Sequence, residues 1–139
     1  MSAGVATMEM PEADLLQRFE SLPQLVNDDP WLLHRGRFVG TDLLVSVGPV
    51  PYYLSIARGR IIACERGPLM MRSWRFAVRG GAEAWRRHWE RMPPPHYHDL
   101  FGLAKRGLVT IEGDIHPLMA NLFYFKDVLS APRRLAGAA

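Results

Sequence analysis

Several features that would assign a protein to a compartment or a chemistry are missing from this sequence. It has a single cysteine, Cys64, which excludes an intrachain disulfide and a thiolate metal cage. No apolar run approaches the ~20 residues that a membrane-spanning helix needs. The N-terminus lacks a basic stretch followed by an apolar one, and the C-terminus lacks a peroxisomal tripeptide. We therefore expect a cytoplasmic protein without an integral membrane segment.

An excess of one charge is also missing. The net charge is +3, and the 17 basic residues include only two lysines, Lys105 and Lys126, against 14 acidic residues. Because the arginines alternate with acids along the chain, we expect no nucleic-acid partner. With 48% hydrophobic and 22% charged residues, the 139 residues have the composition of a globular protein, long enough for one domain with a core.

The N-terminal region predicts a tail followed by a helix. Residues 1–10 are mostly small residues and methionines, and we expect a flexible tail. Pro11 suits the first position of a helix, and Pro23 should end or bend that helix. Between them, apolar residues recur at helical spacing. These residues are Leu15, Leu16, Phe19 and Leu22.

From residue 37 to residue 79 the apolar residues recur with a period of two, which is typical of strands. Turns at Gly48, Gly59 and Gly67 separate the runs, and short turns between alternating runs predict antiparallel hairpins. The segment therefore predicts an antiparallel meander of four strands. Its alternating apolar residues include Val39, Leu43, Val45, Val47, Tyr52, Leu54, Ile56, Ile61, Trp74, Phe76 and Val78.

The remaining chain predicts helices and one more strand. A helix over residues 82–92 stops before three prolines, and a short helix over residues 98–106 ends at Gly107. A strand over residues 108–112 leads into a final helix over residues 115–131, which is apolar nearly all round and must be enclosed. The apolar face of the 82–92 helix consists of Trp85, Trp89 and Met92.

The order of these elements predicts an α+β fold, with a mostly antiparallel sheet covered on one face by helices. We expect a single domain over residues 11–131, followed by a flexible C-terminal tail over residues 132–139. The sequence contains no internal repeat and no break that would indicate a second domain.

Three stretches give the chain a resemblance to the sterol carrier protein type 2-like family. They are Tyr52 to Ile61, a strand, a tight glycine turn and a strand; Phe76 to Trp85, a strand that enters a helix through small residues; and Gly107 to Asp114. The resemblance covers roughly residues 12–131. It implies a five-stranded sheet, about four helices and an apolar tunnel between them that binds fatty acyl chains, sterols or similar molecules.

The resemblance carries over no catalytic residue, no cofactor and no metal, so it implies a non-enzymatic binding protein. Its partner would be a lipid or another apolar small molecule, held in a cavity between sheet and helices. The candidate cavity-lining residues are Val45, Val47, Leu54, Ile56, Trp74, Phe76, Leu103, Leu118, Met119, Leu122, Phe123 and Phe125. The aromatic residues among them could instead fill the tunnel and leave a dry core.

Two alternatives stay open. A metal or acid/base site would use His96, His98, Asp99, Asp114 and His116. Their spacing does not place two histidines on one helix face. The simpler interpretation is that His98 or Asp99 caps the helix over residues 98–106 and that Asp114 caps the final helix. The second alternative is a protein-interaction module of the same fold with an occluded cavity, acting as a homodimer or on a protein partner. Its exposed anchors would be Tyr53, Phe101 and Tyr124.

A basic stretch on the predicted 82–92 and 98–106 helices could also meet an anionic headgroup. It consists of Arg86, Arg87, Arg91, Lys105 and Arg106. Because acids interleave with the arginines on the first of these helices, a solvated face is the better interpretation.

Overall fold

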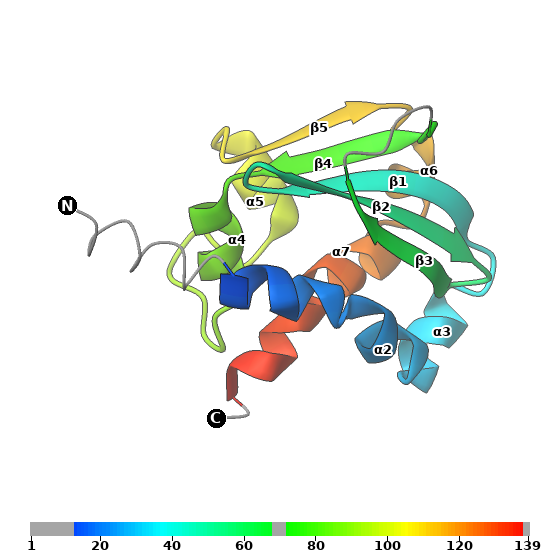
Figure 1. The fold of residues 1–139 in the computed structure, drawn as a ribbon, viewed down its shortest axis with the longest axis horizontal. Coiled ribbons are helices and arrows are strands. Elements are labelled where there is room, and N and C mark those ends of the chain that lie inside the picture. Colours follow the sequence, from blue (N-terminus) through cyan, green and yellow to red (C-terminus); the bar gives the residue numbers. More distant parts are fainter. Residues whose placement is uncertain (1–12, 68–71, 138–139) are drawn as a thin grey trace.

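The computed structural model describes residues 13–67 and 72–137, arranged as a layer of strands and a layer of helices (Figure 1). The five strands pair in the order β3-β2-β1-β4-β5. The helices gather on one side of this sheet. The α+β class and the mostly antiparallel sheet covered on one face are thereby confirmed. The tail predicted over residues 1–10 lies outside the described residues.

The elements follow the chain in a simple order, which begins with a helical segment over residues 13–20. They continue as α2 (Leu22–Asn27), α3 (Pro30–Arg35), β1 (Gly40–Val47), β2 (Val50–Ala57), β3 (Arg60–Arg66), β4 (Phe76–Gly80), α4 (Ala82–His88), α5 (Leu100–Lys105), β5 (Val109–Gly113), α6 (His116–Ala120), α7 (Leu122–Ser130) and the 3₁₀ helix η1 (Ala131–Gly137). None of these helices is long and apolar enough to cross a bilayer.

The first three strands form the predicted hairpins. β1 pairs with β2 through the turn at Gly48, and β2 pairs with β3 through the turn at Arg58 and Gly59. Both residues of the second turn have a positive φ, 53° at Arg58 and 79° at Gly59. Positive φ at both central residues defines the type I′ turn, whose twist matches that of the flanking strands.

The prediction of a four-stranded antiparallel meander is wrong in one respect. β4 does not lie beside β3; it pairs in parallel with β1, with Leu43 opposite Phe76. The connection over residues 67–75 is long enough for this crossing. β1 and β4 are apolar on consecutive positions, so apolar side chains point to the opposite face of the sheet as well as to the face that the helices cover. Leu43 and Leu44 of β1, like Phe76 and Ala77 of β4, are at most 9% exposed.

The glycine and aspartate that flank β5 have the predicted structural roles. Gly107, at a φ of 77°, ends α5: its N–H donates to Ala104 O, and the Leu108 N–H donates to Leu103 O. This pair of bonds is the Schellman ending of a helix. At the other end, the Asp114 Oδ1 accepts a hydrogen bond of 3.1 Å from the His116 N–H. A carboxylate in that place satisfies an amide that the first helical turn leaves free.

The final helix predicted over residues 115–131 is interrupted. Asn121, at φ −129° and ψ 44°, lies between α6 and α7 and is not helical. Its side chain donates to Pro117 O at 3.0 Å, a local bond that competes with the helical hydrogen-bond pattern. The interruption turns α7 relative to α6, so the apolar residues of the two segments need not share one face.

Two further boundaries differ from the prediction. α4 ends at His88 rather than at Met92, which is 83% exposed. Met92 precedes a proline, a position disfavoured in the helical region. The domain also continues past residue 131. In η1, the Arg133 Nε donates to His88 O at 2.9 Å, and the Arg134 Nη2 lies 2.7 Å from the Asp29 Oδ2. These side-chain contacts attach the segment that was expected to be a tail.

Candidate functional site

The space between sheet and helices is the site that the sequence predicts. Eight of the twelve candidate lining residues belong to the buried core of the molecule. They are Val45, Val47, Leu54, Ile56, Phe76, Leu103, Leu118 and Phe125. Each is at most 3% exposed, and the five from the sheet lie on β1, β2 and β4. The structure thus brings this subset together.

The other four candidates lie outside that core. Met119 and Phe123 are 49% and 70% exposed. Leu122 is half-buried between them. Trp74 precedes β4 and is half-buried, with the guanidinium carbon of Arg79 5.9 Å from its ring centre. Alternation along the strand does not extend to Trp74, because β4 begins only at Phe76.

Aromatic side chains occupy the interior of the layer, and several of them were not among the candidates. Phe19 lies 4.6 Å from Tyr52 and 5.9 Å from Trp89, measured between ring centres. Trp89 in turn stacks on Trp85 at 5.2 Å. All four residues are at most 1% exposed. The two tryptophans on one face of the predicted 82–92 helix could have indicated that aromatic rings fill the interior, since two such large rings have to be buried under the sheet.

Hydrogen bonds fix the polar atoms of these rings. The Trp85 Nε1 donates to Ser46 O at 2.9 Å, and the Trp89 Nε1 donates to Leu129 O at 2.6 Å. The second bond joins α4 to the end of α7. A buried indole N–H without a partner is costly, so these bonds hold both rings in one orientation.

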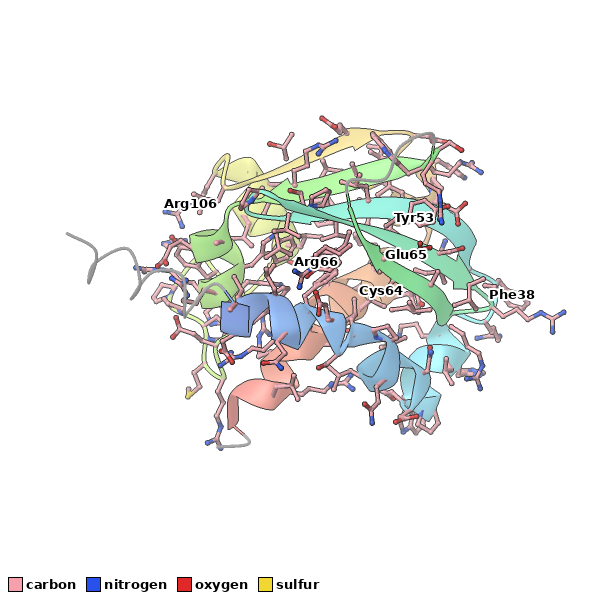
Figure 2. The ribbon with its side chains drawn as sticks, in the orientation of Figure 1. Phe38, Tyr53, Cys64, Glu65, Arg66 and Arg106 are labelled. Atoms are coloured by element: carbon pink, nitrogen blue, oxygen red, sulfur yellow. The ribbon has the colours of Figure 1, made fainter. Side chains whose placement is uncertain are left out.

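A polar cluster closes the layer at its β3 edge. The Glu20 Oε2 accepts hydrogen bonds from the Tyr52 hydroxyl at 2.6 Å and from the Arg66 Nε at 2.9 Å. Figure 2 shows Arg66 between β3 and the first helical segment. Burial tends to raise the pKa of Glu20, but the hydrogen bonds from Tyr52 and Arg66 outweigh it, so the pKa lies below its usual value. Burial raises the pKa of the neighbouring Cys64 to about 11, which keeps this thiol protonated.

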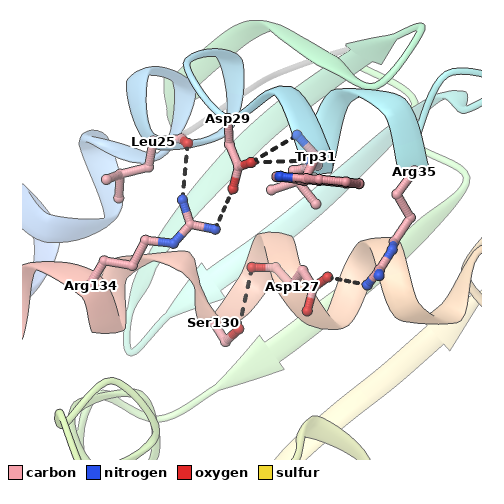
Figure 3. Close-up of polar contacts among 8 residues, drawn as sticks. Leu25, Asp29, Trp31, Arg35, Asp127, Ser130 and Arg134 are labelled. Carbon is pink, nitrogen blue, oxygen red and sulfur yellow. Dashed lines mark hydrogen bonds and ion pairs between the residues drawn. The ribbon is translucent and has the colours of Figure 1, made fainter.

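A hollow of about 420 Å³ opens at the interruption between α6 and α7. Arg35 of α3 borders it on one side, and Phe123 borders it on the other. The Arg35 Nη1 lies 2.6 Å from the Asp127 Oδ2, so an ion pair spans α3 and α7 (Figure 3). The full lining consists of Arg35, Ala120, Asn121, Leu122, Phe123 and Tyr124.

Tyr124 closes this hollow toward the sheet. Its hydroxyl donates to Gly59 O at 2.6 Å, and its ring packs against Gly36 so closely that any side chain at position 36 would overlap it. The Gly59 N–H donates to Val39 O at 3.2 Å. The end of α3, the β2–β3 turn and α7 therefore meet at one junction. The prediction that Tyr53 and Tyr124 are exposed anchors is wrong, since they are only 7% and 1% exposed.

A second hollow, of about 460 Å³, lies between α2 and η1. Arg134 crosses it: the Nη1 donates to Leu25 O at 3.4 Å, and the Nη2 contacts Asp29 (Figure 3). Asp28 and Gln24 also line it. Its walls combine these charged and polar residues with the apolar Leu25, Pro30 and Leu135.

The candidate metal ligands are not brought together. Asp99 lies 2.9 Å from the Lys126 Nζ, and Asp114 lies 3.1 Å from the Arg75 Nη2. Over residues 13–67 and 72–137, no three histidine, cysteine or acidic side chains are grouped as metal ligands. The hydrogen bond from the His116 amide and the Arg75 charge lower the pKa of Asp114, a shift that its structural role explains.

No protein-family model and no curated protein matches the sequence. Solved structures do match it. They include a sterol carrier protein 2, with a TM-score of 0.66 at 14% identity over 84% of this chain and 94% of that one. A conserved Thermus thermophilus protein, described as a candidate sterol carrier protein, matches with a TM-score of 0.61 at 13% identity over 86% and 87%. The UbiJ-SCP2 ubiquinone synthesis protein matches with a TM-score of 0.54 at 17% identity over 83% and 87%. At these identities the likeness establishes the fold: this chain has the sterol carrier protein 2-like fold.

Proposed function

We propose that this chain binds an amphipathic small molecule, with a fatty acyl, sterol-like or similar apolar part held between the sheet and the helices. The fold shared with a sterol carrier protein supports this function. So does the apolar character of both layers where they meet, since eight of the predicted lining residues face one another there. The ligand would replace contacts that these residues now make with aromatic neighbours.

The observation that carries the proposal is that two phenylalanines at the start of α7 face opposite ways, one toward solvent and one toward the interior. Phe123 is 70% exposed, whereas Phe125 is fully buried with its ring centre 5.3 Å from that of Phe76. Because the chain is not helical at Asn121, α6 ends and α7 begins beside the hollow. An apolar tail that approaches along Phe123 would reach the interior by displacing Phe125, which only packing holds in place.

A polar head group would lie at the rim of the hollow. The guanidinium of Arg35 is half-exposed and pairs with Asp127. An anionic head could share this cation, because a guanidinium offers five N–H donors and Asp127 is bonded to one of its nitrogens. The hollow, at about 420 Å³, has the size of known small-molecule sites, which range over about 300–1,000 Å³.

The expected affinity is modest. Burial of ten methylene groups would gain about 8 kcal/mol, at about 0.8 kcal/mol for each group. Association costs about 4–15 kcal/mol, and displacement of Phe125 adds to that cost. Even at the lowest cost the methylenes leave a net gain of about 4 kcal/mol, so micromolar binding also requires the contacts of the head group at Arg35.

Native mass spectrometry of the purified protein, followed by organic extraction, tests for a co-purified ligand. Titration with a fluorescent C16 fatty acid then measures the affinity. Phe123→Asp should weaken binding by about tenfold or more, because it puts a charge where the tail passes. Met92→Asp replaces another exposed apolar side chain, in the segment after α4 and outside the lining of the hollow, and should leave the affinity unchanged.

Absence of acyl and sterol-like binding at high micromolar concentration would overturn the proposal. The full burial of the aromatic cluster would then favour the second candidate, an interaction module of the same fold with an occluded interior. Size-exclusion chromatography with light scattering would test whether its partner is a second copy of the chain.

A further inference from the structure

Two aromatic side chains near α3 are almost entirely exposed. Trp31 and Phe38 are each 84% exposed, more than any other aromatic residue in the described part of the chain. Trp31 lies in the first turn of α3, and Phe38 lies in the turn that follows this helix. Figure 3 shows Trp31 beside Arg35, and Figure 2 shows Phe38 projecting from the end of the molecule. Water is a poor environment for both rings.

Several arginines lie on the same chain segment as these rings or on the neighbouring turn. Arg35 lies between Trp31 and Phe38 in sequence, and the guanidinium of Arg37 lies 4.8 Å from the Phe38 ring centre. Arg58 and Arg60 flank Gly59, whose backbone contacts the Gly36–Val39 turn. Four arginines thus lie on two chain segments whose backbones are in contact, residues 35–39 and 58–60, and among the described residues the only acid that forms an ion pair with any of them is Asp127.

Most arginines on the rest of the described surface have an acidic partner, although Arg91 and Arg106 have none. Arg75, Arg79 and Arg87 each pair with an acid at 3.1 Å or less. Over residues 13–67 and 72–137, Arg37, Arg58 and Arg60 have no such ion pair. Their charges are available to a partner, and the partner has to be negatively charged.

The backbone at Arg58 gives a separate indication. Its φ of 53° is in the left-handed region, where an arginine is uncommon and where Asn, Asp or Gly are preferred in this turn. The side chain is exposed and makes no hydrogen bond or ion pair with a described residue that would explain its presence. A strained backbone position whose side chain makes no intramolecular contact of this kind suggests that the side chain binds a partner.

We propose that Trp31, Arg35, Arg37, Phe38, Arg58 and Arg60 form a docking surface for an anionic lipid bilayer, called here the Phe38 surface. The aromatic rings would enter the headgroup region, and the guanidiniums would contact lipid phosphates. A bilayer fits better than an acidic protein, because Phe38 projects from the molecule and lines neither of the two hollows described above. The docking does not rest on the proposed ligand binding, so each proposal can fail alone.

The full chain can be tested with sedimented vesicles of phosphatidylcholine, with and without phosphatidylglycerol. We expect binding to the anionic vesicles, loss of binding as salt is raised, and little binding to pure phosphatidylcholine. The double variant Arg58→Asn, Arg60→Gln should bind at least about tenfold more weakly. The control is the double variant Arg91→Gln, Met92→Ser, which alters an exposed arginine and an exposed apolar residue in the segment after α4. It should bind the anionic vesicles like the parent.

Tryptophan fluorescence tests whether the exposed aromatic rings enter the bilayer. Trp31 is the most exposed tryptophan in the described structure, whereas Trp85 and Trp89 are buried, so vesicle binding should shift the emission to shorter wavelength mainly through Trp31. Trp31→Phe should abolish most of that shift and still bind. Phe38→Ser should weaken binding severalfold without changing the circular dichroism spectrum.

Equal binding to both kinds of vesicle would overturn the proposal, as would unchanged binding of the arginine and Phe38 variants. A parent protein that self-associates, with Phe38→Ser restoring the monomer, would also overturn it and assign the surface to a second copy of the chain. Fatty acid binding of the same variants, measured without vesicles, separates this result from a failure of the ligand proposal.

Discussion

The aromatic residues inside the molecule and those on its surface near α3 differ in what holds them. Inside, Trp85 and Trp89 each donate a hydrogen bond to a backbone carbonyl, and Phe19 packs against two other rings. Outside, Trp31 and Phe38 have neither burial nor a ring partner among the described residues; only a cation lies over Phe38. The fold explains the position of the first group completely and that of the second group not at all.

This contrast separates stability from function. A substitution in the interior should cost stability through lost packing and unpaired polar groups. A substitution on the Phe38 surface should leave stability nearly unchanged, and any effect it has should appear in binding. Four substitutions test how sharp the division is.

The largest effect is expected for Trp89→Ala. The change removes a fully buried ring and leaves Leu129 O without its donor, so it should lower the free energy of unfolding by about 3–5 kcal/mol. Urea unfolding measures it. Trp31→Ala is the matched control on the surface and should stay within about 0.5 kcal/mol of the parent. Similar losses for the two variants would contradict the comparison.

The interior should also respond to pH through His88. Burial, helped by the charge of Arg133, lowers its pKa to about 4, despite a hydrogen bond to Tyr97 O that acts the other way. The unfolded chain, with an ordinary histidine pKa near 6.5, then binds more protons than the folded chain between pH 4 and 6.5. Stability should therefore fall by up to about 3 kcal/mol as the pH drops through that window.

The variant His88→Gln should flatten this pH dependence, because its side chain does not titrate. Chemical denaturation at several pH values between 4 and 7 measures it. His34→Gln, on the exposed face of α3, serves as the control and should keep the slope of the parent. An unchanged slope in His88→Gln would assign the acid sensitivity to other groups.

A smaller effect is expected for Tyr124→Phe. The variant keeps the ring but removes the hydroxyl that donates to Gly59 O, at a cost of about 1–2 kcal/mol. Because that bond joins α7 to the β2–β3 turn, hydrogen exchange of the Gly59 amide should also become faster. Tyr97→Phe, at a half-buried ring, is the control. Loss of stability without faster exchange at Gly59 would mean that the bond does not hold the turn.

The smallest effect should have the opposite sign. Arg58→Asn places a residue that tolerates positive φ in a type I′ turn, so it should raise the free energy of unfolding by about 0.5–1 kcal/mol. Thermal unfolding measures it. Arg60→Asn lies at the start of β3, where no such relief exists, and should give no gain. A variant that is more stable and yet binds anionic vesicles less well would separate the two roles most clearly.

Much of the fold was accessible from local signals. Alternation around Tyr52 and Leu54, with Gly48 and Gly59 as turns, predicted two hairpins correctly, because register and turn chemistry are short-range properties. Gly107 predicted the end of α5 for the same reason. The parallel pairing of β1 with β4 was missed, since no local rule says which strand lies beside which after a connection of this length. The consecutive apolar residues at Leu43 and Leu44 were the available sign that β1 is central.

The site was less accessible. The prediction placed Phe123 and Phe125 together, although two residues that are two apart in α7 lie about 200° apart around the helix axis. Helical periodicity alone could not reveal which of the two rings turns inward. The exposure of Phe38 was equally hidden, because an apolar residue between Arg37 and Val39 is indistinguishable by pattern from the first residue of a strand.

The parallel pairing of β1 with β4 has a consequence for the order of folding. The β1–β2 and β2–β3 hairpins close over turns of two residues. β4 and β5 can join the sheet only after the much longer loop between Leu43 and Phe76 has closed. Loops of that length close at a larger entropic cost than tight turns, so the three-stranded half should form first. Pulse-labelled hydrogen exchange should find the amides of β2 protected before those of β5. Simultaneous protection would indicate that the two halves condense together.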